Sequence, residues 1–190
     1  MVMTRNPLSE GRRAVTIRVG AAVAIALAIG LGVWLFAVDD RSSNDANASS
    51  TEPVLVSAQG LGDVAIRAHH PVYWAGPIAG TSYELTRTKD GRIYVRYLPK
   101  GVEAGDPRPK YTTVGTYPKT NAYGALRKAS TRPGAKAYDT TGGAFVLTNT
   151  KTPSSAYFAF KASPYLVEVF NPSAWKALQL TLSGRIRPIR

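Results

Sequence analysis

Hydrophobic and polar residues divide this chain into an unbroken apolar stretch, a short polar stretch and a long region of mixed periodic patterns. Residues Val19 to Val38 are twenty consecutive residues without a charged or strongly polar side chain. As an α-helix rising about 1.5 Å per residue they would span about 30 Å, the thickness of a bilayer's hydrocarbon core. The pattern predicts a transmembrane helix over residues 19–38, preceded by a stub of residues 1–18.

Charges on the two flanks predict the orientation of this helix. Four arginines against one glutamate precede it, whereas two aspartates and one arginine follow it. Excess positive charge favours the cytoplasmic side, so we expect a single-pass protein of the cell membrane with its C-terminal part outside the cytoplasm. The alternative is a cleaved secretory signal, whose apolar core is usually about 7–15 residues long. We favour a retained anchor, because this apolar run is longer.

A stripe of small residues repeats every fourth position in the predicted helix. It consists of Gly20, Ala24, Ala28 and Gly32. Small side chains on one stripe could let two helices approach closely and form a homodimer in the bilayer. Because Gly and Ala make up about half of this segment, the same spacing also arises by chance, and both interpretations stay open.

The residues after the predicted helix form a linker and then a domain. Residues 39–52 contain no large apolar side chain, so nothing offsets the entropy of ordering them, and we expect a flexible polar linker. Residues 53–190 are enough for one folded domain with its own core. Cysteine is absent, which excludes disulfides, thiol nucleophiles and thiolate metal sites.

Net charge belongs almost entirely to this predicted domain. The chain carries a formal charge of +12, and the first 52 residues are neutral, with five arginines against five acids. Residues 53–190 hold 19 Lys or Arg against 7 Asp or Glu. Such a surface attracts anionic lipid, anionic wall polymer or nucleic acid, and salt weakens the attraction.

Periodicity within the domain predicts helices interleaved with antiparallel strands. Apolar residues at helical spacing follow Ser57, a favourable N-cap, and predict a helix that ends near His69. Further helices are expected over 119–130 and from Pro172 to Gly184, the latter with Trp175, Leu178 and Leu182 on one face. Strands are predicted over residues 72–74, 83–88, 92–98, 112–117, 156–161 and 165–170.

Asp90-Gly91 between two strand-like runs predicts a β-hairpin with a two-residue turn. That turn would set Arg87 opposite Tyr94 and Leu85 opposite Arg96. Four cations and one tyrosine would then share the outward face, and they are the candidate site for an anion or a partner. These residues are Arg87, Lys89, Arg92, Tyr94 and Arg96. The alternative is that these residues form an ordinary solvent-exposed face of a basic protein, without a binding role.

Shifting the numbering by 62 aligns two parts of the domain. Seven identities fall in nineteen ungapped positions from Pro71 to Lys89, among them Leu85 on Leu147. We therefore predict an α+β fold built from two similar halves, residues 53–118 and 119–190. Each half would be a helix followed by an antiparallel meander, with the helices on one face of the sheet. A single α+β domain with accidental similarity is the alternative.

Catalytic and metal-binding patterns are weak in this domain. His69 and His70 are adjacent and lack a third convergent ligand, so no metal site is predicted. The chain shows no nucleophile elbow and no phosphate-binding Gly loop, and we predict no catalytic residue and no cofactor. An envelope hydrolase stays the alternative, and it would require the candidate acids and histidines to converge in one cleft. They are Asp63, His69, His70, Glu84, Asp139 and Glu168.

Three short segments carry a resemblance to a group of known sequences. They are His70 to Pro77, Tyr83 to Thr86 and Gly91 to Pro99. They resemble uncharacterised single-pass envelope proteins of high-GC Gram-positive bacteria, a resemblance that implies location and no activity. We thus expect a non-enzymatic, membrane-tethered external module that binds an anionic envelope component or a partner protein. Extracellular nucleic-acid binding is a less favoured alternative.

Overall fold

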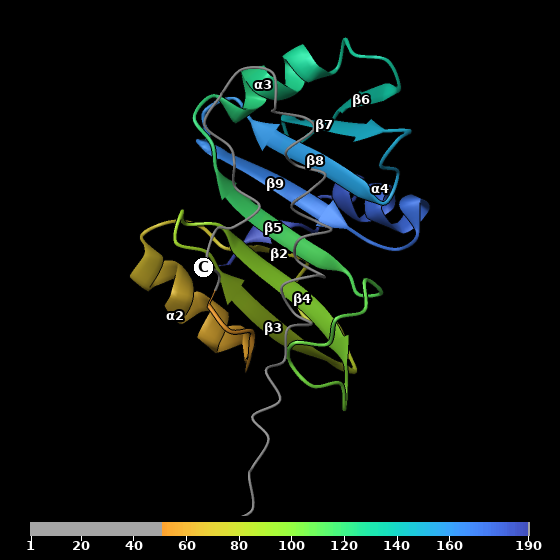
Figure 1. Cartoon of the computed structure of the whole chain (residues 1–190). Coiled ribbons are helices and arrows are strands. Elements are labelled where there is room, and N and C mark those ends of the chain that lie inside the picture. The colour runs from red at the N-terminus through yellow and green to blue at the C-terminus, as the bar shows by residue number, and fades with distance from the viewer. Residues whose placement is uncertain (1–50, 190) are drawn as a thin grey trace, which may run out of the picture.

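A computed structural model describes residues 51–189, which form three helices and ten strands of an α+β fold (Figure 1). The helices are α2 (Ala58–Ala68), α3 (Ala122–Ala129) and α4 (Ala174–Leu182). The strands are β1 (Val54–Val56), β2 (Tyr73–Trp74), β3 (Thr81–Arg87), β4 (Ile93–Pro99), β5 (Thr113–Pro118), β6 (Ala135–Asp139), β7 (Ala144–Asn149), β8 (Ser155–Phe160), β9 (Tyr165–Phe170) and β10 (Arg187–Pro188). The predicted stub, transmembrane helix, small-residue stripe and most of the linker lie outside the described residues. Within residues 51–189, no helix has the length and apolar character needed to cross a bilayer.

Eight of the strands form one antiparallel sheet in the order β1-β3-β4-β5-β9-β8-β7-β6. Two meanders therefore meet at the central pair β5–β9, where Val114 lies opposite Val169. The remaining strands, β2 and β10, pair with each other as a separate two-stranded ribbon. The pairing of β10 with β2 thus joins the C-terminal part of the domain to the segment that follows α2.

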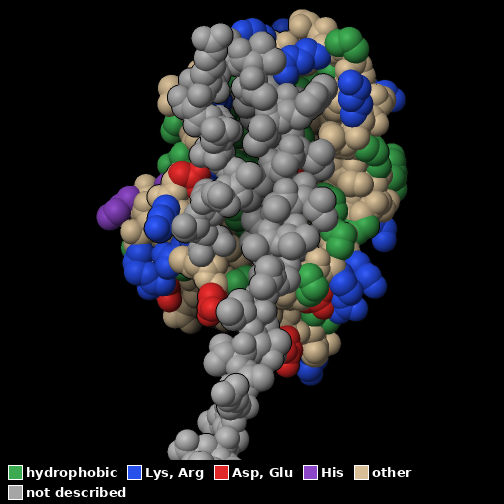
Figure 2. Space-filling model, viewed as in Figure 1, with side chains coloured by type: hydrophobic (Ala, Val, Ile, Leu, Met, Phe, Trp, Pro, Cys, Tyr) green, Lys and Arg blue, Asp and Glu red, His purple; other side chains and the backbone are tan. Residues whose placement is uncertain are grey.

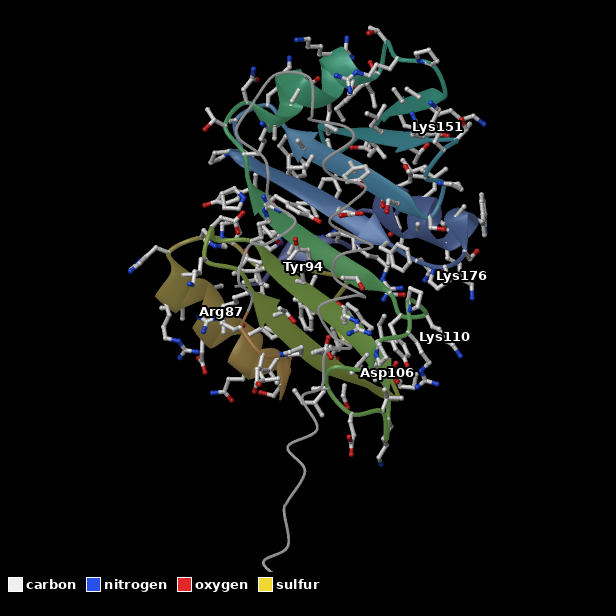
Figure 3. All side chains as sticks on the ribbon, viewed as in Figure 1. Arg87, Tyr94, Asp106, Lys110, Lys151 and Lys176 are labelled. Carbon is white, nitrogen blue, oxygen red and sulfur yellow. The ribbon has the colours of Figure 1, made fainter. Side chains whose placement is uncertain are left out.

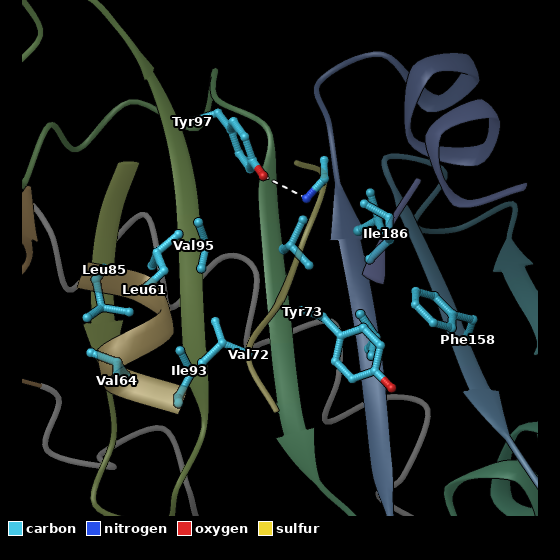
Figure 4. Close-up of a cluster of buried hydrophobic side chains, with 14 of the residues drawn as sticks. Leu61, Val64, Val72, Tyr73, Leu85, Ile93, Val95, Tyr97, Phe158 and Ile186 are labelled. Atoms are coloured by element: carbon cyan, nitrogen blue, oxygen red, sulfur yellow. Dashed lines mark hydrogen bonds between the residues drawn. The ribbon is translucent and has the colours of Figure 1, made fainter. Parts of the chain in front are cut away.

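Helices cover both faces of the sheet. One face, here called the α2 face, packs against α2, α4 and the β2–β10 ribbon through a large apolar cluster that includes Leu61, Val95 and Phe158 (Figure 4). The other, here called the α3 face, packs α3 onto β7, β8 and β9 through a smaller cluster around Leu126 and Leu147. The prediction that the helices share one face is wrong, because the alternating strands of the second meander are apolar on both sides.

The predicted start and end of α2 are confirmed. The Gly60 N–H donates to Ser57 Oγ at 3.0 Å, as an N-cap requires. His69 ends the helix in a left-handed conformation with φ of 53°. The two histidines therefore stand at a helix C-terminus, before Pro71, where the chain turns towards β2.

The hairpin between β3 and β4 turns through three residues, Lys89 to Gly91, and the two-residue prediction is wrong. The strand register pairs Arg87 with Ile93, where a two-residue turn would pair it with Tyr94. Gly91 has a φ of 84°, the left-handed position that closes a three-residue loop. Because successive side chains alternate, the slip of one residue moves Tyr94 to the opposite face from Arg87.

The offset of 62 aligns strands of the two halves, but it does not align side chains on the same face of the sheet. Shifting β3 by 62 gives residues 143–149, which overlap β7, and shifting β4 gives residues 155–161, which overlap β8. However, Leu85 packs in the cluster of the α2 face, whereas Leu147 packs in the cluster of the α3 face. The ungapped alignment therefore relates strands of the same order whose corresponding side chains point to opposite sides of the sheet.

α4 presents a different side to the sheet than its sequence predicts. Ala177 and Thr181 are buried, whereas Trp175 is 67 % exposed and Leu182 is 39 % exposed. The predicted apolar stripe of Trp175, Leu178 and Leu182 is thus only partly engaged, through Leu178. Small residues at the contact let the helix lie close to β8, which leaves the indole on the surface.

Candidate functional site

The five residues of the predicted binding face do not form one surface. Tyr94 and Arg96 are buried on the α3 face of β4. Arg87 is exposed, and Figure 3 shows it near one margin of the domain with Tyr94 towards the middle. Lys89 is exposed in the turn, and Arg92 Nε lies 2.6 Å from Asp90 Oδ2 within the same turn. The three-residue loop is the cause, because it sets the register of the whole hairpin.

Arg96 instead belongs to a buried ion pair. Its Nη1 donates to Glu84 Oε1 at 2.7 Å across the β3–β4 pair, and both side chains are almost inaccessible to solvent. Arg96 Nη2 also donates to the Asp106 carbonyl at 2.8 Å, and the Gly105 N–H donates to Glu84 Oε2 at 2.6 Å. The pair therefore holds the loop between β4 and β5 against the sheet. It stabilises the fold and presents no free charge.

A second buried carboxyl lies at the centre of the α3 face. Glu168 accepts hydrogen bonds from Ser155 Oγ at 2.7 Å, from Tyr157 Oη at 3.0 Å and from Tyr117 Oη. Burial raises the pKa of Glu168 above its usual value, and the three hydroxyl donors lower it by less. The ring of Tyr94 packs edge-on against Tyr117, and burial raises the pKa of Tyr94 to about 12. Both carboxyl oxygens of Glu168 are therefore engaged inside the sheet.

The six candidate acids and histidines of the hydrolase alternative do not converge within the described residues. Glu84 and Glu168 share the α3 face, but β4 and β5 separate their strands, which corresponds to about 14 Å. Asp63 lies on α2, at the opposite face, and His69 is the C-cap of that helix. The His70 ring packs on Tyr165 with centroids 5.6 Å apart. Asp139 lies on the edge strand β6. Among residues 51–189, no group of three His, Asp or Glu side chains is placed to hold a metal ion.

Positive charge is concentrated in the second half of the domain. Residues 119–190 hold 11 Lys or Arg against two acids, one of which is the buried Glu168, whereas residues 53–118 hold eight against five. In Figure 2 the visible acidic side chains lie mostly on the half that carries α2, β3 and β4. The first half also pairs several of its cations internally, as in Arg108 with Asp106 and Arg92 with Asp90. The second half therefore carries most of the net positive charge.

A groove opens on this basic half, between α4 and the edge strands β6 and β7. It has a volume of about 190 Å³, and none of the described residues that line it is acidic. Its lining residues are Lys136, Tyr138, Thr148, Asn149, Thr150, Pro153, Ala174, Trp175 and Leu178. The groove exists because α4 packs mainly on β8 and β9 and less on β7, so it does not cover the α2 face of the edge strand β6.

One lysine lines the groove, and two others are sequence neighbours of lining residues. Lys136 lines it from β6, Lys176 follows Trp175 on α4, and Lys151 follows Thr150 in the β7–β8 loop. Figure 3 shows Lys110, Lys176 and Lys151 along one margin of the domain. No element of the sequence pattern singled out this site. Its one visible signal is a tryptophan next to a lysine at the start of a helix, which also fits a core position.

Comparison of the chain with models of protein families, with curated proteins and with solved structures finds no match.

Proposed function

We propose that this chain is a non-enzymatic module of the bacterial cell envelope, anchored in the membrane by residues 19–38, that holds an anionic envelope component outside the cytoplasm. The observation that carries the proposal is the charge of residues 119–190, 11 cations against two acids. Charged side chains that meet an anionic polymer in high dielectric bind it weakly one by one and strongly together. The buried carboxyls of Glu84 and Glu168 do not compete with this polymer for the surface cations, because both are engaged inside the sheet.

The proposal predicts that charge reversal in the second half weakens retention on a polyanion. The test uses the full-length chain in a non-ionic detergent, agarose carrying polygalacturonate, and a range of salt concentrations. Lys136→Glu, Lys151→Glu and Lys176→Glu together should elute at a much lower salt concentration than the unsubstituted chain, because three exposed cations of one surface become repulsive.

A matched control removes the same charge elsewhere. Arg87→Glu, Lys89→Glu and Lys100→Glu change three exposed cations of the first half. This variant should keep most of its retention. Equal losses in the two variants would contradict a binding surface in the second half, and a chain that is not retained at low salt would contradict the proposed function itself.

The predicted orientation can be measured because the chain has no cysteine. A single Ala162→Cys variant places a thiol at an exposed position of the β8–β9 turn, and Ser9→Cys places one in the predicted stub. We expect a membrane-impermeant maleimide to label Ala162→Cys in intact cells and Ser9→Cys only after lysis. Labelling of Ser9→Cys in intact cells would reverse the proposed orientation, and loss of the first residues from the mature chain would favour a cleaved signal.

We also propose that the two meanders are a pseudo-twofold pair. The symmetric strand order about β5–β9 supports this arrangement. A twofold axis perpendicular to the sheet would relate the two meanders and keep each side chain on its own face of the sheet. The even offset of 62 places Leu85 and Leu147 on opposite faces, so equivalent residues must differ in number by an odd offset. Leu85 then corresponds to a residue next to Leu147. The hydrolase alternative has no observation in its favour among the described residues.

A further inference from the structure

We propose that the groove between α4 and the β6–β7 edge is a subsite for one ring of an acidic polysaccharide, which stacks on Trp175 while lysines at the rim pair with its anionic groups. This inference deepens the proposed function and rests on it. It assigns the basic half a defined site and a ligand class, in place of a diffuse attraction to any polyanion.

Both walls of the groove are held in place by hydrogen bonds. Asn149 is 3 % exposed, and its Oδ1 accepts from the Lys151 N–H at 2.8 Å, which fixes the loop that carries Lys151. The Thr150 N–H donates to the Gly134 carbonyl at 2.9 Å, and the Asn171 N–H donates to the Ser154 carbonyl at 3.0 Å. The β7–β8 loop is thus tied both to the edge of β6 and to the start of α4. A preformed site loses little entropy when a ligand binds.

The shape of the groove favours part of a polymer over a free small molecule. Its volume is about 190 Å³. Pockets that enclose a whole small ligand typically have volumes of about 300–1,000 Å³. One ring can enter, and the remainder of a chain must then lie over the surface between Lys136, Lys151 and Lys176. These three lysines are all exposed, so the flanking units of a polymer can reach them.

The chemistry of the lining favours a sugar ring. The face of a pyranose ring carries C–H groups that pack flat on an indole, and its hydroxyls need hydrogen-bonding neighbours at the edge. Trp175 supplies an exposed indole, and Thr148 and Thr150 supply hydroxyls beside it. Single-stranded nucleic acid would need successive aromatic platforms along a basic groove, whereas Trp175 is the one largely exposed aromatic side chain in residues 51–189.

Calorimetry with defined probes tests this inference on the full-length chain in a non-ionic detergent. The probes are a galacturonate heptamer, the neutral maltoheptaose, a polyphosphate of similar charge and an oligodeoxythymidylate. We expect Trp175→Ala to weaken binding of the galacturonate heptamer about tenfold and to leave polyphosphate binding unchanged. Lys151→Ala combined with Lys176→Ala should weaken both. Ile66→Ala, a change at another exposed apolar side chain, should weaken neither.

Each result has a distinct consequence. If Trp175→Ala binds the galacturonate heptamer as the unsubstituted chain does, the subsite is refuted while the proposed function stands. Tighter binding of oligodeoxythymidylate than of the heptamer, with loss in Trp175→Ala, would refute the sugar and identify a nucleic-acid site. If the unsubstituted chain binds none of the three anionic probes at low salt, the proposed function fails as well. Circular dichroism of every variant shows that a loss of binding is not a loss of fold.

Discussion

Arg96→Met should lower the free energy of unfolding by about 3–5 kcal/mol, because it leaves the Glu84 carboxylate buried without its partner. Glu84 is fully inaccessible to solvent, so water cannot replace the guanidinium. The substitution also removes the donor to the Asp106 carbonyl, which should release the loop between β4 and β5. Urea denaturation of the full-length chain in detergent, followed by circular dichroism, measures the loss.

Two further variants separate the ion pair from the loss of a side chain. Arg87→Met changes an exposed arginine of the same hairpin and should alter the unfolding free energy by no more than about 0.5 kcal/mol. The double variant Glu84→Leu with Arg96→Met removes both charges, so it should be more stable than Arg96→Met alone. It should stay below the unsubstituted chain, because the Gly105 N–H loses its acceptor. A double variant no more stable than the single one would contradict this account.

Glu168→Gln should change how stability depends on pH. The pKa of Glu168 is raised by burial in the folded state, so the folded chain holds this proton more tightly than the unfolded chain. The stabilisation is complete below the ordinary pKa of about 4.5 and is lost as pH rises through the raised value. In that interval the unfolding free energy falls by up to about 1.4 kcal/mol per pH unit. Glutamine cannot titrate, so the variant should gain stability relative to the unsubstituted chain as pH rises above 4.5.

The hydrogen bonds of this cluster are tested by Glu168→Leu. Leucine leaves the hydroxyls of Tyr117, Ser155 and Tyr157 without their acceptor. Each buried hydroxyl without a partner costs about 1–3 kcal/mol, so this variant should be destabilised at every pH. Parallel pH profiles for the unsubstituted chain and Glu168→Gln would contradict a raised pKa of Glu168, because they would mean that the folded and unfolded chains bind this proton equally.

Local chemistry in the sequence was sufficient for most of the elements. Ser57 as an N-cap and the turn before Pro71 defined α2, and the apolar runs located six of the ten strands, with β9 predicted to the residue. β1, β6, β7 and β10 were not predicted as strands. β1, β6 and β10 are short or polar and are stabilised by pairing rather than by their own pattern. Such edge strands become visible once their partners are in place.

The faces of the sheet were harder to predict than its strands. A loop of three residues instead of two at Gly91 changed the register, and with it the positions of Tyr94 and Arg96 relative to Arg87. The alternation of side chains also puts Leu85 and Leu147 on opposite faces of the sheet, although an offset of 62 aligns their strands. Side chains alternate along a strand, so an error of one residue reverses every orientation after it.

The amino-acid sequence by itself determined the plan of the protein: an apolar run suited to a bilayer, a polar linker, a cysteine-free α+β domain and an excess of positive charge. These features depend on composition and on neighbours along the chain. The tertiary structure decided which charges stay available, because packing buried Arg96 with Glu84 and left Trp175 beside a groove. Residues of that groove come from β6, β7 and α4, which are distant in the sequence, and only the folded sheet brings them together.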